Sequence, residues 1–145
     1  MSLPVRHLPL VQNWDCHVCG QCCKEYTVHV TPEEQAKIEQ QGWAKLPEFA
    51  GIPLIVRDGW FSRRMRLNHR ADGSCVFLGD DGLCRIHKQF GSAQKPLACQ
   101  LYPYVLIPTG DHWRVGVRFA CPSATANKGR PLHEPRADLT TYAQQ

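Results

Sequence analysis

Four cysteines fall within eight residues near the start of this sequence, in the order Cys16-x-x-Cys19-x-x-Cys22-Cys23. Two residues between successive cysteines let the chain turn so that both sulfurs face one centre. Thiolates in this arrangement bind zinc or iron–sulfur clusters. The sequence therefore predicts metal chelation by all of its cysteines, which are Cys16, Cys19, Cys22, Cys23, Cys75, Cys84, Cys99 and Cys121.

Disulfide bonding is the alternative use of an even number of cysteines. Eight cysteines in 145 residues lie below the roughly 8–10% that is typical of short disulfide scaffolds. Residues 1–10 read MSLPVRHLPL and lack the uninterrupted apolar segment of a signal peptide. No stretch approaches the ~18 apolar residues of a membrane span. We therefore expect a cytoplasmic protein without a membrane partner, whose reduced thiols bind metal.

The crowded cysteines supply half of a ligand set. The side chains of the neighbours Cys22 and Cys23 are expected to diverge, so that they do not serve one tetrahedral metal together. Gly20 lies inside the second Cys-x-x-Cys step and is expected to adopt a positive φ in a tight turn. The sequence leaves open whether there is one site or two, and which of the distal cysteines complete it: Cys75, Cys84, Cys99 and Cys121.

Short helices are expected to position these cysteines. Thr31–Glu34 reads as a helix start, with Thr31 as N-cap and Glu34 closing a capping box, and the helix should run to about Gln41. The other predicted helices are Cys84–Phe90, ending at Gly91, Pro96–Leu101, and one that begins near Arg136 in the tail.

Short strands complete the predicted elements. Tyr26–Val30 alternates between polar and apolar residues and predicts a strand. Asp58-Gly59 between two apolar segments is a strong hairpin signal. The predicted hairpins pair Ile52–Arg57 with Trp60–Leu67 and Tyr104–Ile107 with His112–Phe119, and Cys75–Leu78 is expected to form a strand fragment before a turn at 79–82.

The composition predicts one small, loop-rich α+β domain over residues 1–145, with a core at about 14–122 and a tail at 123–145. Apolar residues make up 43% of the chain, while 11 glycines and 11 prolines divide it into short pieces. The tail has no closing signal, as expected for a piece of a longer protein. The net charge of +4 is mild, so nucleic acid is not an expected partner.

The segments around the cysteines together resemble a known family. They are Cys16–Cys23, Cys75-Val-Phe-Leu, Asp81-Gly82-Leu83-Cys84-Arg85-Ile86-His87, Lys95-Pro96-Leu97-Ala98-Cys99-Gln100-Leu101-Tyr102-Pro103, and Cys121. In order and spacing they are similar to the CxxCxxCC (YkgJ-like) zinc- or iron-chelating family, a pattern that also occurs in flagellin lysine-N-methylase-like proteins. The resemblance covers Cys16 to Cys121 and includes all eight cysteines.

The resemblance implies metal chelation, and three functions compete. The first is an iron–sulfur protein, with a [4Fe-4S] cluster and a redox role. The second is a structural zinc module that displays a surface to a protein partner, and the third is a domain of a protein lysine methylase, which would use S-adenosylmethionine. Whether the chain is an enzyme stays open. The sequence departs from the family at Gln100, where arginine is usual, and at His87, where tyrosine is common.

Four further side chains are candidates for the metal site. His17 and His87 could each replace a sulfur as a zinc ligand, although we favour an outward-pointing His17 and a packed His87. Arg85 and Lys95 adjoin the cysteine segments and either offset thiolate charge or lie on the surface as ordinary charges.

Arginines and aromatic residues crowd the first predicted hairpin. Such a mixture can bind nucleic acid or an acidic protein. We favour a solvated strand face, on which Phe61, Met65 and Leu67 share one side. The residues concerned are Arg57, Trp60, Phe61, Arg63, Arg64, Arg66 and Arg70.

Overall fold

The computed structural model describes residues 11–134 and 137–143, and its chain divides into two compact units. Unit 1 joins the segment that ends at His17 to the segment that begins at Pro103, and unit 2 is Val18–Tyr102. Both are built from short helices and short antiparallel strands separated by loops, so the predicted α+β class is confirmed. No helix in the described residues is long and apolar enough to cross a membrane.

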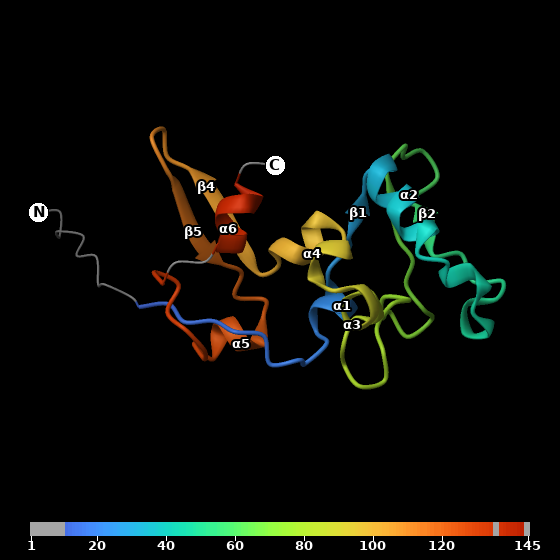
Figure 1. Cartoon of the computed structure of the whole chain (residues 1–145), viewed down its shortest axis with the longest axis horizontal. Helices are drawn as coiled ribbons and strands as arrows, with labels where there is room; N and C mark the ends of the chain where they lie inside the picture. The colour runs from blue at the N-terminus through green and yellow to red at the C-terminus, as the bar shows by residue number, and fades with distance from the viewer. Residues whose placement is uncertain (1–10, 135–136, 144–145) are drawn as a thin grey trace, which may run out of the picture. The chain divides into compact units, whose positions relative to one another are not determined.

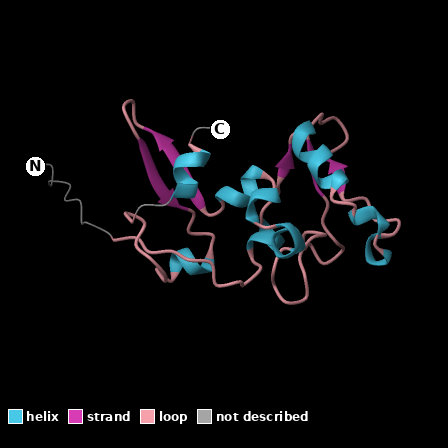
Figure 2. Ribbon diagram, in the orientation of Figure 1, coloured by secondary structure: helices cyan, strands magenta, loops and turns pink. Residues whose placement is uncertain are grey.

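A three-stranded antiparallel sheet lies in unit 2, and loops take up most of that unit's ribbon (Figure 2). The predicted strand over Tyr26–Val30 is shorter than expected because a helical turn precedes it. Tyr26 caps that turn by donating its backbone N–H to the Cys22 carbonyl. The elements are α1 (Cys22–Glu25) and the strands β1 (His29–Val30), β3 (Met65–Leu67) and β2 (Ile55–Arg57), in the order β1-β3-β2.

The connection between β2 and β3 is longer than the predicted two-residue turn at Asp58-Gly59. It spans 58–64 and is closed by a hydrogen bond from the Asp58 N–H to the Arg64 carbonyl at 2.9 Å. Phe61 is 96% exposed on this loop, whereas Leu67 is buried. The prediction that they share one strand face was therefore wrong, because the strand begins only at Met65.

The helix α2 (Pro32–Gln40) begins as predicted. Thr31 accepts a hydrogen bond from the Glu34 N–H, and the Glu34 carboxylate accepts one from the Thr31 N–H. Gly42 follows the helix at φ 78°, as expected for a helix stop. Two short 3-10 helices come next, η1 (Trp43–Lys45) and η2 (Pro47–Phe49).

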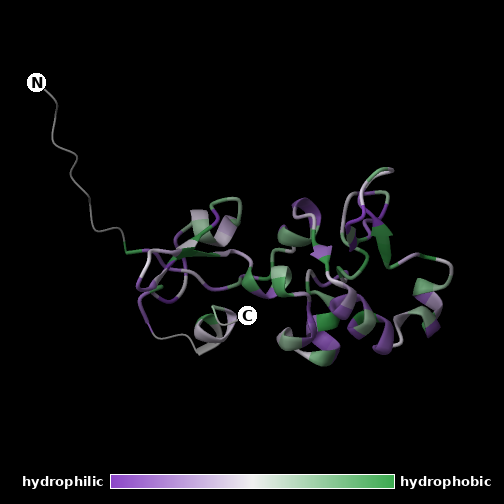
Figure 3. Ribbon diagram, turned by 90° about the horizontal axis from the view of Figure 1, so that it is seen from above, coloured by the Kyte–Doolittle hydropathy of each residue, from purple (hydrophilic) through white to green (hydrophobic). Residues whose placement is uncertain are grey.

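The core of unit 2 gathers around Phe77. The Trp43 ring meets the Phe77 ring edge to face, with 5.4 Å between centroids, and Ile86 is also buried. Hydrophobic and hydrophilic stretches alternate closely along this unit (Figure 3). The predicted strand fragment at Cys75–Leu78 is instead a buried turn, in which the Leu78 N–H bonds to the Cys75 carbonyl at 3.0 Å.

Two predicted helices of unit 2 are confirmed. The helix α3 (Arg85–Phe90) has Cys84 as its N-cap and ends at Gly91. The helix α4 (Leu97–Leu101) has Pro96 as its N-cap. A 3-10 turn, η3 (Ser92–Gln94), connects them.

Unit 1 contains the second predicted hairpin, which the structure confirms as an antiparallel pair. Trp14 packs edge to face on Tyr104 with 5.0 Å between ring centroids, and the Arg130 guanidinium binds the Asp15 carboxylate. The predicted helix start near Arg136 lies outside the described residues. The elements are β4 (Tyr104–Pro108), β5 (Trp113–Val117), α5 (Pro122–Thr125) and α6 (Ala137–Tyr142).

Candidate metal centre

Five thiols line one cavity of about 30 Å³ inside unit 2, a volume that holds about two water molecules. No carboxylate of the described residues contributes to its walls, which are completed by apolar and aromatic side chains, one imidazole and one ammonium group. We call this the five-thiol cavity. Its cysteines are Cys22, Cys23, Cys75, Cys84 and Cys99.

The adjacent Cys22 and Cys23 both face this cavity, and the Cys23 thiol hydrogen bonds to Cys22. The prediction that they diverge was wrong because they open the helical turn α1. Neighbouring side chains diverge to opposite faces in a strand but not in a helix. The main chain also fixes this corner, since the Cys75 N–H donates to the Cys23 carbonyl at 2.6 Å.

The other three thiols arrive on separate segments. Cys75 lies on the buried turn before α3, Cys84 caps α3, and Cys99 lies within α4. The helices α1, α3 and α4 gather in one part of unit 2 (Figure 1). Main-chain contacts hold the walls together, including the hydrogen bond from the Arg85 N–H to the Phe77 carbonyl at 2.8 Å.

The cavity separates the thiols by acidity. The hydrogen bond from Cys23 lowers the pKa of the Cys22 thiol to about 6. Burial raises the pKa of the Cys75 thiol to about 11 and raises the pKa of Cys99 strongly. The hydrogen bond to Cys22 raises the pKa of Cys23. Coordinating sulfurs must be deprotonated, so metal binding at this site would release protons.

Lys95 brings a positive charge to the cavity wall. Its charge opposes the effect of burial on the Cys99 pKa and adds to the lowering of the Cys22 pKa by Cys23. No carboxylate forms an ion pair with Lys95 in the part of the chain that the structure describes. Of the two roles foreseen for Lys95, the position beside the sulfurs favours charge compensation over an ordinary surface charge.

His69 also lines the cavity, and sequence reasoning missed it. Its Nδ1 lies 3.4 Å from the Arg66 guanidinium, and burial lowers the pKa of its imidazole. The signal is structural, because His69 pairs with Cys75 in an isolated antiparallel bridge. His69 lies outside the cysteine segments that the sequence singled out, so its proximity to the thiols became evident only from this bridge.

The remaining three cysteines have other surroundings. Cys19 is an exposed residue of unit 2, and Cys16 is an exposed residue of unit 1. Cys121 is buried in unit 1, where its sulfur accepts a hydrogen bond from Trp14 Nε1 at 3.4 Å. Across the described residues, no three His, Cys, Asp or Glu side chains already form a group that could hold a metal ion. The ligand role of all eight cysteines thus stays a prediction.

Two glycines, Gly20 and Gly82, determine the position of the segment around Cys19. Gly20 has a φ of 69°, as predicted. A side chain at Gly82 would lie 2.8 Å from the Val18 carbonyl oxygen, so this close approach requires glycine. The segment around Cys19 therefore packs on the turn that precedes Cys84.

The alternative candidates lie elsewhere. His17 Nδ1 is 2.8 Å from the Ser123 hydroxyl within unit 1. His87 is exposed on α3 rather than packed. The Arg85 guanidinium pairs with Glu48 at 2.6 Å and stands over the Phe49 ring, which is a surface role.

Comparisons with known proteins agree with a metal-binding domain. Residues 15–128 match the model of the CxxCxxCC family, described as a "putative zinc- or iron-chelating domain". A curated relative, uncharacterized protein MJ0939 of Methanocaldococcus jannaschii, is 29% identical over 93 residues. That alignment covers 63% of this chain but only 29% of the relative. No solved structure matches the chain.

Proposed function

This chain belongs to the CxxCxxCC family of zinc- or iron-chelating domains, and from that premise we propose that unit 2 binds its metal through the five-thiol cavity. The observation that carries the proposal is the convergence of thiols from separate segments in one cavity that no carboxylate of the described residues lines. Hard cations such as calcium and magnesium require oxygen ligands, whereas zinc and iron–sulfur clusters take thiolates. The donor set therefore selects soft-ligand metals.

The charge of the cavity supports the same proposal. Lys95 is half-buried on the cavity wall, where its ammonium group is attracted to any negative charge that gathers in the cavity. Four thiolates around a divalent metal, or around an iron–sulfur core, leave a net negative centre. Lys95 is placed to compensate that charge. We expect it to contribute to metal affinity in the way that other groups surrounding metal ligands do.

A [4Fe-4S] cluster is the first candidate cofactor. Such clusters are held by four cysteine thiolates, and the cavity offers five. When bound, the cluster would supply one-electron transfer. The residues of the chain would hold it and shield it from water, since Phe77 and Ile86 form apolar walls and solvent access tunes the reduction potential.

A single structural zinc ion is the second candidate. The observation that favours it is the cavity volume of about 30 Å³, because one tetrahedral ion needs less room than a four-iron core. Its four ligands would come from the same cysteines, and the fifth thiol would remain a packed side chain.

Anaerobic purification followed by absorption spectroscopy and metal analysis tests both candidates. A broad band near ~400 nm that bleaches with dithionite, together with iron and sulfide, supports the cluster. A colourless protein with one zinc per chain supports the structural site. If the chain binds neither metal with stoichiometry, the proposal is wrong.

Other expectations stay predictions. These are a cytoplasmic location, a protein partner, and the methylation of protein lysines with S-adenosylmethionine. The matched region is only 29% of the length of the curated relative. An activity of that whole protein can therefore be transferred to this chain only as a proposal.

A further inference from the structure

The loop 58–64, which we call the aromatic loop, exposes two large side chains. Trp60 is 87% exposed and Phe61 is 96% exposed. Two such residues together present on the order of 300–500 Å² of apolar surface. A contiguous apolar patch of that size on a protein surface commonly marks a binding site.

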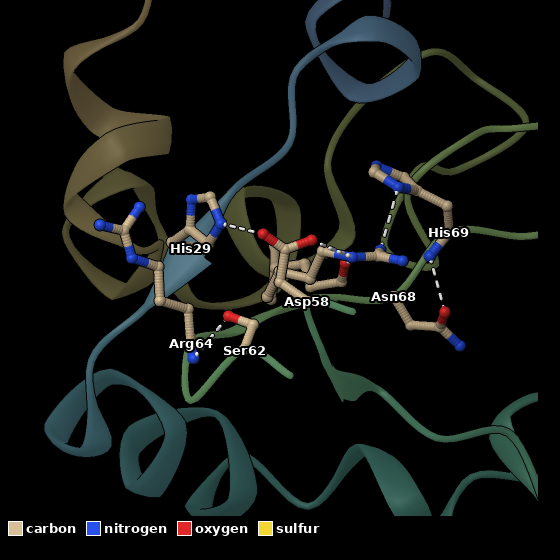
Figure 4. Close-up of polar contacts among 8 residues, drawn as sticks. His29, Asp58, Ser62, Arg64, Asn68 and His69 are labelled. Atoms are coloured by element: carbon tan, nitrogen blue, oxygen red, sulfur yellow. Dashed lines mark hydrogen bonds and ion pairs between the residues drawn. The ribbon is translucent and has the colours of Figure 1, made fainter. Parts of the chain in front are cut away.

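The base of the aromatic loop is held by polar contacts (Figure 4). His29 Nε2 lies 2.6 Å from one oxygen of the Asp58 carboxylate, and Arg66 Nε lies 3.4 Å from the other. The Ser62 hydroxyl accepts a hydrogen bond from the Arg64 N–H at 3.0 Å. These contacts position the tip before any ligand binds, which reduces the ordering that binding requires.

Exposed arginines flank the aromatic side chains. Arg57, Arg63 and Arg64 are exposed, and none of them has an ion pair with a carboxylate of the described residues. Every basic residue from 52 to 70 other than histidine is arginine, and none is lysine. Arginine forms bidentate bonds with carboxylates and is enriched at protein interfaces, where lysine is depleted.

We infer that the aromatic loop docks into a groove of a partner protein that has an apolar floor and an acidic rim. Trp60 and Phe61 would fill the floor. The three flanking arginines, Arg57, Arg63 and Arg64, would pair with carboxylates on the rim. Tryptophan and arginine dominate the residues that carry the binding energy of protein interfaces.

The observations favour a protein over nucleic acid or a lipid surface. Single-stranded nucleic acid is bound in basic grooves that track a backbone over several nucleotides, whereas two adjacent aromatic residues on a short loop form a tip. A lipid surface attracts lysine and arginine alike, and this loop has only arginine. The inference does not depend on which metal unit 2 binds.

Photo-cross-linking in the cells that produce the protein tests the inference. The photoreactive residue p-benzoylphenylalanine replaces Phe61 in one sample and the exposed Trp113 of β5 in the control, and cross-linked peptides are sequenced. We expect Phe61 to capture protein segments rich in Asp and Glu, and R63E/R64E to abolish this capture. The inference would be overturned by cross-links to nucleic acid or lipid, or by cross-links to protein segments without acidic residues. It would also be overturned if the Phe61 sample captured no more protein than the Trp113 control.

Binding of the captured segment, synthesised as a labelled peptide, gives the quantitative test. Because Trp60 and Phe61 are exposed, replacing both with alanine should leave thermal unfolding and metal content unchanged. We expect that variant, and R63E/R64E, to weaken binding at least about tenfold. The matched control R114E alters an exposed arginine of β5 and should change binding less than about twofold. Affinities of the loop variants equal to that of R114E would contradict the docking site.

Discussion

The five cysteines that line the cavity differ in their surroundings from the remaining three, Cys16, Cys19 and Cys121. Cys22 lies in the five-thiol cavity and forms a hydrogen bond with a second thiol, whereas Cys19, three residues earlier, is exposed. Both belong to the same repeated Cys-x-x-Cys step. Spacing identifies candidate ligands, but the local backbone and the segments packed against it decide which sulfurs converge.

The backbone explains the difference. Cys22 opens a helical turn that is hydrogen bonded to the Cys75 segment. Cys19 lies between Val18, with a φ of 57°, and Gly20, with a φ of 69°, so its segment takes a different course. We therefore expect substitutions in the two groups of cysteines to differ in their effect on metal binding.

The largest effect is expected from Cys75→Ser. Cys75 lines the cavity, and we expect this variant to lose its metal and to unfold at a lower temperature, because a structural metal contributes on the order of 10 kcal/mol to folding. Cys121→Ser is the matched control, since Cys75 and Cys121 are both 7% exposed. Metal analysis and thermal unfolding are the measurements. Equal metal loss in both variants would contradict the prediction that the cavity cysteines bind the metal and Cys121 does not.

Acid should weaken metal binding steeply. The raised pKa values of Cys23, Cys75 and Cys99 mean that these thiols are protonated near pH 7 without metal. Each one that becomes a ligand must release a proton, so the affinity rises with pH. With two such ligands we expect at least about a hundredfold loss of affinity per pH unit between pH 8 and pH 6. Competition with a chelator measures it, and a flat profile would contradict these ligands.

Lys95→Met should have an intermediate effect. Removal of the charge beside the sulfurs is expected to weaken metal affinity about 10- to 100-fold, and Lys95→Arg should restore most of it. The control Lys45→Met changes an exposed lysine of η1. Chelator competition at one pH compares the variants. If Lys95→Met binds metal as tightly as Lys45→Met does, charge compensation by Lys95 is wrong.

The smallest effect is expected from Thr31→Ala. Loss of the capping box should lower the free energy of unfolding by about 1 kcal/mol, measured by denaturant unfolding of the metal-loaded protein. Metal affinity should not change, because the N-cap of α2 does not line the cavity. The control Thr27→Ala removes an exposed threonine outside the helices and strands. A large change in metal affinity would show that α2 and the cavity are coupled.

Local rules predicted the helices α2, α3 and α4, but not the short helices α1 and α5. The Thr31 capping box and the stop at Gly91 both depend on residues close in sequence. The same rules failed at Cys75–Leu78, where an apolar run forms a buried turn. They also failed for Phe61, because the strand begins only at Met65 and the base of the loop before it is held in part by His29 of another strand. Contacts between distant segments leave no local signal.

The candidate site was also predicted only in part from the sequence. Cysteine spacing indicated the metal chemistry, but the pairing of Cys22 with Cys23 required the helical geometry of α1. His69 lies beside the thiols because it pairs with Cys75 in an isolated antiparallel bridge. The sequence alone did not indicate which of the eight cysteines line the cavity, because that depends on contacts between distant segments.

Main-chain hydrogen bonds, rather than the thiols, join the walls of the five-thiol cavity. The bonds from Cys75 to Cys23 and from Arg85 to Phe77 use only backbone atoms. A descendant of this protein could therefore exchange one ligand at a time, cysteine for histidine, while these backbone bonds persist. Metal preference could then diverge among lineages faster than the architecture that surrounds it.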